Sequence, residues 1–157
     1  MNLIGLKPNH FELSAFLTLY LVMTASIIYE GDLRCQCTHV QSGTVIETDA
    51  PTDNRGKGAR FSPTDTLCVS LATCVITTMG IRAADMQVDL KNTKISVTKH
   101  MLPDPRRVGG IDVALELPGK NISDHQREIL QKIGDNCPVM KSIHPDIKVN
   151  LSYSWAD

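Results

Sequence analysis

The sequence has few aromatic residues and almost no net charge. Aromatic side chains make up 4% of the 157 residues, and sixteen basic residues face seventeen acidic ones, which leaves a formal net charge of −1. Without a basic excess, the chain lacks the electrostatic footprint of a general nucleic-acid-binding protein. With so few aromatic rings, it also lacks platforms on which single-stranded bases stack. These two absences argue against a nucleic-acid partner.

The cysteines lack the spacing of a disulfide framework. There are five of them, and no C-x-x-C pair occurs. An odd number in a chain of this length argues against a secreted disulfide scaffold, and the missing C-x-x-C pair argues against a thioredoxin motif or a zinc ribbon. We therefore expect a cytoplasmic protein with one or more working thiols, and no part of the sequence indicates a cofactor.

The length predicts a single domain that follows a short extension. A chain of 157 residues is long enough for one domain with a hydrophobic core, and it contains no internal repeat. Ala15–Met23 is a short apolar run, but Glu12 precedes it and the cleavage-site pattern of a signal peptide is poor. We expect residues 1–22 to be an N-terminal extension outside the functional protein, with a weak signal peptide as the alternative, and residues 23–157 to form the domain.

One uncharged stretch, Ser62–Ile81, predicts the central helix. Ser62 suits the N-cap, Pro63 suits the first helical position, and Asp65 stands where it would complete a capping box. No charge follows from Thr66 to Ile81, and a helix that is apolar on all sides is a buried helix. It falls short of the roughly 20 apolar residues that span a bilayer, so we expect a core helix and no membrane association.

The rest of the chain predicts strands and one further helix. Alternating or β-branched segments predict strands over Ser26–Val40, Thr44–Thr48, Lys94–Met101, Val108–Leu117 and Ile147–Trp155. Ser123 and Gln126 have the spacing of a capping box, which predicts a helix that ends near Gly134. This order of elements predicts an α+β fold, with antiparallel strands around a buried central helix.

Cys74, in the middle of the central helix, is the first candidate for thiol chemistry. Unpaired cysteines often only fill a core, so position alone does not separate the two roles. Cys68 lies six residues earlier and points about 120° away, which favours a core role for Cys68. Cys74 is about 18 Å from the helix start, too far for the helix dipole to lower its pKa. A reactive Cys74 therefore requires a cation beside it.

Cys35, Cys37 and His39 alternate on one face of a predicted strand and are a candidate soft-metal site. Zinc requires a fourth ligand, and no second ligand pair follows at metal spacing. We therefore expect no metal here. Redundant surface thiols are the simpler interpretation, and a soft-metal or thiol-stress buffer is the weaker alternative.

An ordered set of short motifs resembles the family of osmotically inducible protein C (OsmC) and organic hydroperoxide resistance (Ohr) proteins. The motifs are T-D-A-P at Thr48–Pro51, S-P-T-D-x-L at Ser62–Leu67, L-A-T-C at Leu71–Cys74, P-R-R at Pro105–Arg107 and C-P-V at Cys137–Val139. The match extends from about Ile27 to Trp155. The resemblance implies an OsmC-like fold and an intertwined homodimer with two active sites at its interface. It also implies a thiol peroxidase that reduces organic hydroperoxides in oxidative stress defence.

The resemblance assigns roles to individual residues. It matches Cys74 to the peroxidatic cysteine, Cys137 to the resolving cysteine and Arg34 to the catalytic arginine of an early strand. It also implies an external dithiol reductant of the lipoyl type. The family often has a glutamate directly after the proline of the helix start, where it holds the arginine. Here Thr64 takes that position, followed by Asp65.

The departure at Thr64 leaves two questions open. Asp65 is expected either to complete the helix cap or to hold Arg34 in place of the missing glutamate. The alternative to a peroxidase is a non-enzymatic small-molecule-binding or structural dimer of the same fold, in which Cys74 is incidental.

Overall fold

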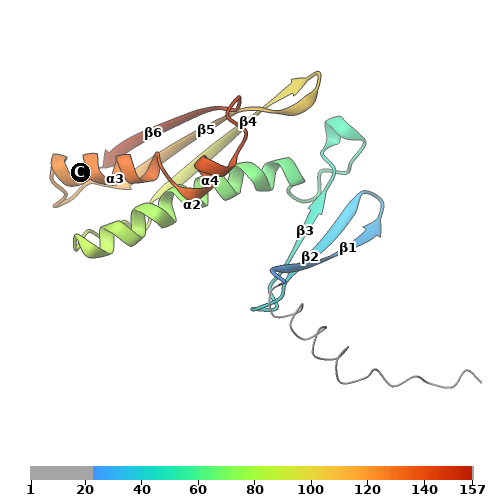
Figure 1. Ribbon diagram of the computed structural model, residues 1–157, viewed down its shortest axis with the longest axis horizontal. Coiled ribbons are helices and arrows are strands. Elements are labelled where there is room, and N and C mark those ends of the chain that lie inside the picture. The colour runs from blue at the N-terminus through green and yellow to red at the C-terminus, as the bar shows by residue number, and fades with distance from the viewer. Residues whose placement is uncertain (1–22, 157) are drawn as a thin grey trace, which may run out of the picture. The chain divides into compact units, whose positions relative to one another are not determined.

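The computed structural model describes residues 23–156 of the chain, which fall into two compact units divided between Ser62 and Pro63. Each unit contains one three-stranded sheet, and the long helices belong to the C-terminal unit (Figure 1). The predicted extension, residues 1–22, lies outside the described residues.

The N-terminal unit is an antiparallel meander of β1 (Ala25–Gly31), β2 (Arg34–His39) and β3 (Val45–Asp49), followed by the short 3-10 helix η1 (Thr52–Asn54). The prediction of one strand over Ser26–Val40 is wrong, because a turn at Asp32 and Leu33 divides it. Both turn residues have positive φ, 49° and 64°, as in a type I′ hairpin turn. Since leucine rarely adopts positive φ, the sequence carries only a weak signal for this turn.

Among the described residues, neither face of the N-terminal sheet forms a core within its own unit. Ile27 and Tyr29 on one face are 64% and 63% exposed, and Ile28 on the other face is 61% exposed. The buried residues of this unit, among those the structure describes, are Thr48, Asp49 and Ser62, which are all polar. A small sheet is stable only when it buries an apolar face. The N-terminal sheet therefore requires a covering surface.

The C-terminal unit has the hydrophobic core. The helix α2 (Pro63–Asp85) packs against β4 (Lys94–Pro103), β5 (Arg106–Pro118), α3 (Asp124–Gly134) and α4 (Pro138–Ser142). Leu71, Val75 and Met79 follow one another at helical spacing and are fully buried. On β5, every second residue from Ile111 to Leu117 is buried in the same cluster. The alternation predicted for this strand is confirmed.

The C-terminal sheet has the order β4-β5-β6, where β6 is Lys148–Ala156. β4 and β5 are antiparallel, but β6 runs parallel to β5, so the prediction of antiparallel strands throughout is wrong. After β5 the chain crosses over through α3 and α4 and returns to begin β6 at the end where β5 begins (Figure 1). A helical crossover of this kind joins parallel strands. Alternating hydrophobicity assigns faces to a strand and says nothing of its direction.

The helix α2 extends beyond the uncharged stretch and is less buried than predicted. It has 23 residues, and by length and composition it would be able to cross a membrane. Its buried face lies in the core, whereas Val69 and Ile81 on its other sides are 36% and 68% exposed. A core helix passes the same test of length and composition. The prediction of a helix buried on all sides is wrong for the single chain.

The predicted cap of the second helix is confirmed. The Ser123 hydroxyl accepts a hydrogen bond from the backbone of Gln126 at 3.3 Å, and the Gln126 side chain accepts one from the backbone of Ser123 at 2.9 Å. Both bonds satisfy amide groups at the start of α3 that have no partner within the helix.

Removing this cap tests how much it contributes to the stability of the fold. We expect Ser123→Ala to lower the free energy of unfolding by about 0.5–2 kcal/mol in urea denaturation. Because the two bonds are reciprocal, Ser123→Ala and Gln126→Ala should be non-additive in a double-mutant cycle. Strict additivity of the two changes would show that they do not form one cap.

Candidate functional site

Cys74 lies on α2 at the edge of the core, with a partly buried side chain. Thr78, one turn later, places its Oγ1 3.9 Å from the Cys74 Sγ and donates a hydrogen bond to the Cys74 carbonyl at 2.7 Å. A hydroxyl has one hydrogen, so Thr78 is left to accept from the thiol. A separate positive group is therefore needed to make Cys74 a nucleophile.

Cys137 is fully buried directly before α4, a short helix that the sequence analysis missed. Its sulfur accepts a hydrogen bond from the backbone of Met140 at 3.4 Å and so caps this helix. Pro138, at the first helical position, was the signal available in the sequence. Because α4 packs on α2, the cap fixes the position of the Cys137 sulfur against the central helix.

The two cysteines that the family resemblance pairs are neighbours in the structure. Burial raises the pKa of the Cys137 thiol, the hydrogen bond from the Met140 amide lowers it, and the nearby Cys74 thiol raises it. Both cysteines are free thiols. The structure thus places a buried thiol beside a more exposed one, the arrangement that a two-cysteine redox couple requires.

Arg34 is held by a carboxylate that the sequence analysis did not single out. Its Nε and Nη2 donate one hydrogen bond each, both 2.8 Å long, to the two oxygens of Asp49. Asp49 is 3% exposed and also accepts a bond from the backbone of Ala59 at 3.1 Å. The bond from Arg34 holds the pKa of Asp49 below its usual range against the effect of burial, and the same bond raises the pKa of Arg34.

The strand predicted over Thr44–Thr48 stops one residue before Asp49, so a cross-strand pair of Asp49 with Arg34 was not predicted. Arg34 and Asp49 are register partners on the antiparallel strands β2 and β3, so their side chains lie on the same face. Both line a small cavity of about 190 Å³, together with Glu30 and Lys57. This space lies below the 300–1,000 Å³ typical of ligand pockets, so it accommodates a small polar group next to the guanidinium.

Asp65 forms an ion pair that neither expected role included. Lys99 lies on the inward face of β4, is 18% exposed and bonds to the Asp65 carboxylate. The same ammonium donates to the Thr64 hydroxyl at 2.9 Å. The position that holds a glutamate in the family resemblance is therefore bound by a cation of this chain.

Cys68 has the core role that was expected. It is 2% exposed, and burial raises the pKa of its thiol, while the charge of Lys99 lowers it to a smaller extent. A buried thiol without exposure to substrate is chemically inert.

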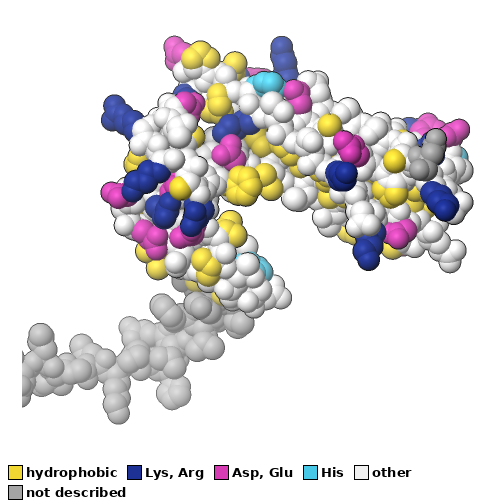
Figure 2. Space-filling model, turned by 180° about the vertical axis from the view of Figure 1, so that it is seen from behind, with side chains coloured by type: hydrophobic (Ala, Val, Ile, Leu, Met, Phe, Trp, Pro, Cys, Tyr) yellow, Lys and Arg dark blue, Asp and Glu magenta, His cyan; other side chains and the backbone are white. Residues whose placement is uncertain are grey.

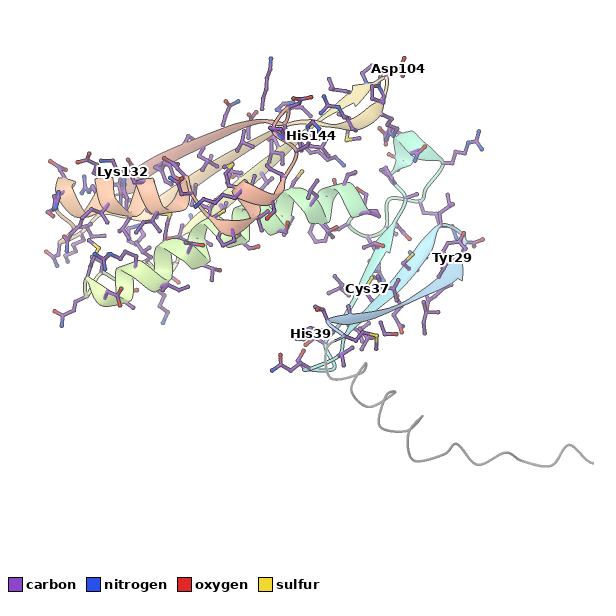
Figure 3. The ribbon with its side chains drawn as sticks, in the orientation of Figure 1. Tyr29, Cys37, His39, Asp104, Lys132 and His144 are labelled. Atoms are coloured by element: carbon purple, nitrogen blue, oxygen red, sulfur yellow. The ribbon has the colours of Figure 1, made fainter. Side chains whose placement is uncertain are left out.

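Cys35, Cys37 and His39 lie at alternate positions along β2, as the sequence predicted. Figure 3 labels Cys37 and His39. His39 is engaged at its Nδ1 by the hydroxyl of Ser42 at 2.7 Å. Within residues 23–156, no group of three or more His, Cys, Asp or Glu side chains is arranged to hold a metal ion. This row accordingly has no chelating geometry in the structure.

Known proteins resemble this chain over most of its length. The family profile described as OsmC-like protein matches residues 56–152. A crystal structure from Psychrobacter arcticus 273-4, described as an osmotic stress induced and detoxification response protein, is 45% identical, with a TM-score of 0.80, and the match covers 84% of this chain and 96% of that one. No match is found among curated proteins.

More distant structures share the fold. An organic hydroperoxide resistance protein from Legionella pneumophila is 15% identical, with a TM-score of 0.65 over 85% of this chain and 98% of that one. A Vibrio cholerae protein described as an organic hydroperoxide resistance protein, with captopril bound in one of its active sites, is 17% identical, with a TM-score of 0.65 over 84% and 92%. The match of the profile and the 45% identity confirm the resemblance found in the sequence: the chain belongs to the family of OsmC-like proteins.

Proposed function

We propose that the protein is a thiol-dependent peroxidase that reduces organic hydroperoxides. The observation that carries the proposal is the contact between the partly exposed Cys74 and the buried Cys137. The description of distant relatives of the same fold as organic hydroperoxide resistance proteins supports it. In this reaction Cys74 is the peroxidatic cysteine and Cys137 the resolving cysteine.

The proposed reaction converts two thiols into one disulfide. The Cys74 thiolate attacks one oxygen of the O–O bond, that bond breaks, and the other oxygen leaves with a proton as an alcohol. Cys74 is then a sulfenic acid, and the Cys137 thiol condenses with it to form an S–S bond and release water. The two electrons that reduce the hydroperoxide come from the two sulfurs. An external dithiol, of the lipoyl type implied by the family, regenerates them by thiol–disulfide exchange.

Arg34 is proposed as the cation that the thiolate requires. The bidentate bond to Asp49 uses two of the five donor hydrogens of the guanidinium. The others remain for the thiolate or for a peroxide oxygen. Asp49 is a positioning residue in this scheme and takes the role that the resemblance gives to a glutamate after Pro63. Asp65, which is bound to Lys99, is assigned a structural role.

A homodimer is proposed as the functional form. Hydrophobic side chains reach the surface in the single chain (Figure 2), including Ile27 and Tyr29 on the N-terminal sheet and Ile81 on α2. Exposed apolar area of this extent indicates an interface. A second copy would cover both the sheet, which has no core of its own, and the open side of α2. The family resemblance places Arg34 and Cys74 together at such an interface.

The non-enzymatic alternative has one observation in its favour. The Thr78 hydroxyl is directed at a carbonyl and leaves the Cys74 sulfur without a donor from that residue. If no cation reaches Cys74 in the dimer, the thiol is not activated as a nucleophile and the same fold would only bind a ligand.

The first prediction of the peroxidase proposal concerns the disulfide. One equivalent of cumene hydroperoxide, added to the reduced protein without oxygen, should join Cys74 to Cys137, because these sulfurs are neighbours. Peptide mapping by mass spectrometry identifies the bond. In Cys137→Ser, the Cys74 sulfenic acid should persist and react with dimedone. Cys68→Ser is the control and should behave as the wild type. Oxidation confined to Cys35 and Cys37 would contradict the assignment.

The second prediction concerns the residue that positions Arg34. Asp49→Asn should slow the attack of Cys74 on cumene hydroperoxide at least about tenfold in stopped flow, because the charge-assisted bidentate bond is lost. Asp65→Asn is the matched control and should leave the rate within about twofold of wild type, since a partly exposed ion pair contributes little. Equal slowing by the two changes would show that Asp49 has no special role.

The pH dependence of the rate tests whether the ionised Asp49 carboxylate positions Arg34. Because the pKa of Asp49 is lowered in the folded protein, its carboxylate is fully ionised above the unfolded value of about 3.9. The rate ratio of wild type to Asp49→Asn should therefore stay constant from neutral pH to about pH 5 and shrink as the pH falls through the folded pKa below 3.9. A ratio that changes around pH 7 would exclude the titration of Asp49 as its cause.

The third prediction concerns assembly. The wild-type protein should be a dimer in solution scattering at micromolar concentration, with more than about 2,000 Å² buried in the interface. Ile81→Asp should shift it toward the monomer, because it places a charge on the open apolar side of α2. The neighbouring change Arg82→Ser, at an exposed polar position, is the control. A monomeric wild type would refute the proposal.

A further inference from the structure

We propose that the C-terminal sheet carries a second binding site, a cleft on its outer face that takes a small organic monocarboxylate. The cleft has a volume of about 470 Å³ and is formed by the β4–β5 hairpin and the start of β6, near the ends that Asp104 and His144 mark in Figure 3. Its volume falls in the range of small-molecule sites. It contains neither Cys74 nor Cys137, so it is independent of the proposed peroxidase site.

The floor of the cleft is a position without a side chain. Gly110 on the central strand β5 lies in register with His100 on β4 and with Lys148 on β6. His100 and Lys148 therefore flank Gly110, which has no side chain to fill the space between them. A Cβ at Gly110 would lie 3.4 Å from the His100 side chain and 3.4 Å from the Lys148 carbonyl. A methyl group at Gly110 would therefore touch both neighbours and occupy the floor of the cleft, which we call the notch.

Asp112, two residues after Gly110 on β5, closes one end of the notch, and both of its carboxylate oxygens are hydrogen-bonded. One oxygen of Asp112 lies 2.6 Å from His100 Nε2, and the other accepts a hydrogen bond of 2.7 Å from the Asn150 amide. The bond to His100 also lowers the pKa of Asp112, which keeps the carboxylate ionised. Since both oxygens of Asp112 are engaged, it offers no strong acceptor to a bound cation.

The basic groups of the cleft, by contrast, have unused donors. Within residues 23–156, no hydrogen bond or ion pair involves the ammonium group of Lys148. Arg107 lies 3.7 Å from Asp146, beyond hydrogen-bond distance, and makes one long bond of 3.5 Å to the Val108 carbonyl. A guanidinium with free N–H groups binds a carboxylate with two parallel hydrogen bonds. Lys148 and Arg107 are therefore the anion-binding groups.

The remaining groups select the size and charge of the ligand. Lys148 and Arg107 balance the charges of Asp112 and Asp146, so a ligand with two negative charges would be repelled by the carboxylates more than a ligand with one. Leu102 is 39% exposed and lines the same cleft. It offers an apolar wall to a short hydrocarbon chain. A short-chain monocarboxylate combines both properties.

Butyrate is the probe that tests this site on the full chain. Two-dimensional NMR of the ¹⁵N-labelled protein should show saturable shifts of the Gly109 and Gly110 amides, with a Kd of about 1 mM or lower. Inorganic phosphate at neutral pH should bind at least about fivefold more weakly, because it is partly a dianion. Shifts that are absent, that do not saturate, or that are stronger with phosphate would overturn the proposal.

Substitutions test whether butyrate binds in the cleft or is only attracted to the basic side chains on the surface. Lys148→Gln should raise the Kd for butyrate about tenfold, a loss typical of a charge-assisted contact. Lys94→Gln is the matched control, because Lys94 lies on the same outer face of the sheet but outside the cleft; its Kd should stay within about twofold of wild type. Gly110→Ala fills the notch without any change in charge and should abolish saturable binding. Wild-type affinity in Gly110→Ala, or equal losses in the two lysine variants, would overturn the assignment.

Discussion

The packing of α2 against β5 is the contact on which the rest of the structure depends. Leu71, Val75 and Met79 bury one face of the helix against the inward residues of the strand. Because this face is fixed, Cys74, next to Val75, is held at the boundary of the core with a partly buried side chain. The short helix α4 docks on the same helix and brings Cys137 to it. Hydrophobic packing thus creates the neighbourhood of the two thiols.

Two of the ion pairs each lie within a single unit. Arg34 and Asp49 are partners across two strands of the N-terminal sheet, and Lys99 and Asp65 join a strand to a helix in the C-terminal unit. Asp49 on β3 therefore binds Arg34, whereas the family resemblance expects a glutamate at the start of α2 to do so. In our proposal this exchange preserves a positioned arginine although Thr64 stands where the family often has a glutamate.

The distribution of apolar residues is uneven, and this has a functional meaning. The buried hydrophobic residues of the described chain lie between Cys68 and Cys137, whereas the N-terminal sheet exposes large apolar residues on both faces. In our proposal, a second copy of the chain covers these exposed apolar residues. On the outer face of the C-terminal sheet, by contrast, polar groups surround the notch at Gly110.

The sequence by itself determined the elements with strong local signals. These are the uncharged central helix, the cap at Ser123, the alternating strands of the C-terminal sheet and the motifs that place the chain among OsmC-like proteins. Only the tertiary structure decided the direction of β6, the partner of Arg34 and the meeting of Cys74 with Cys137. The physical reason is that periodicity and capping act between residues a few positions apart and report the face that a side chain takes. Strand direction and cross-strand partners depend on long-range pairing, which no local pattern encodes.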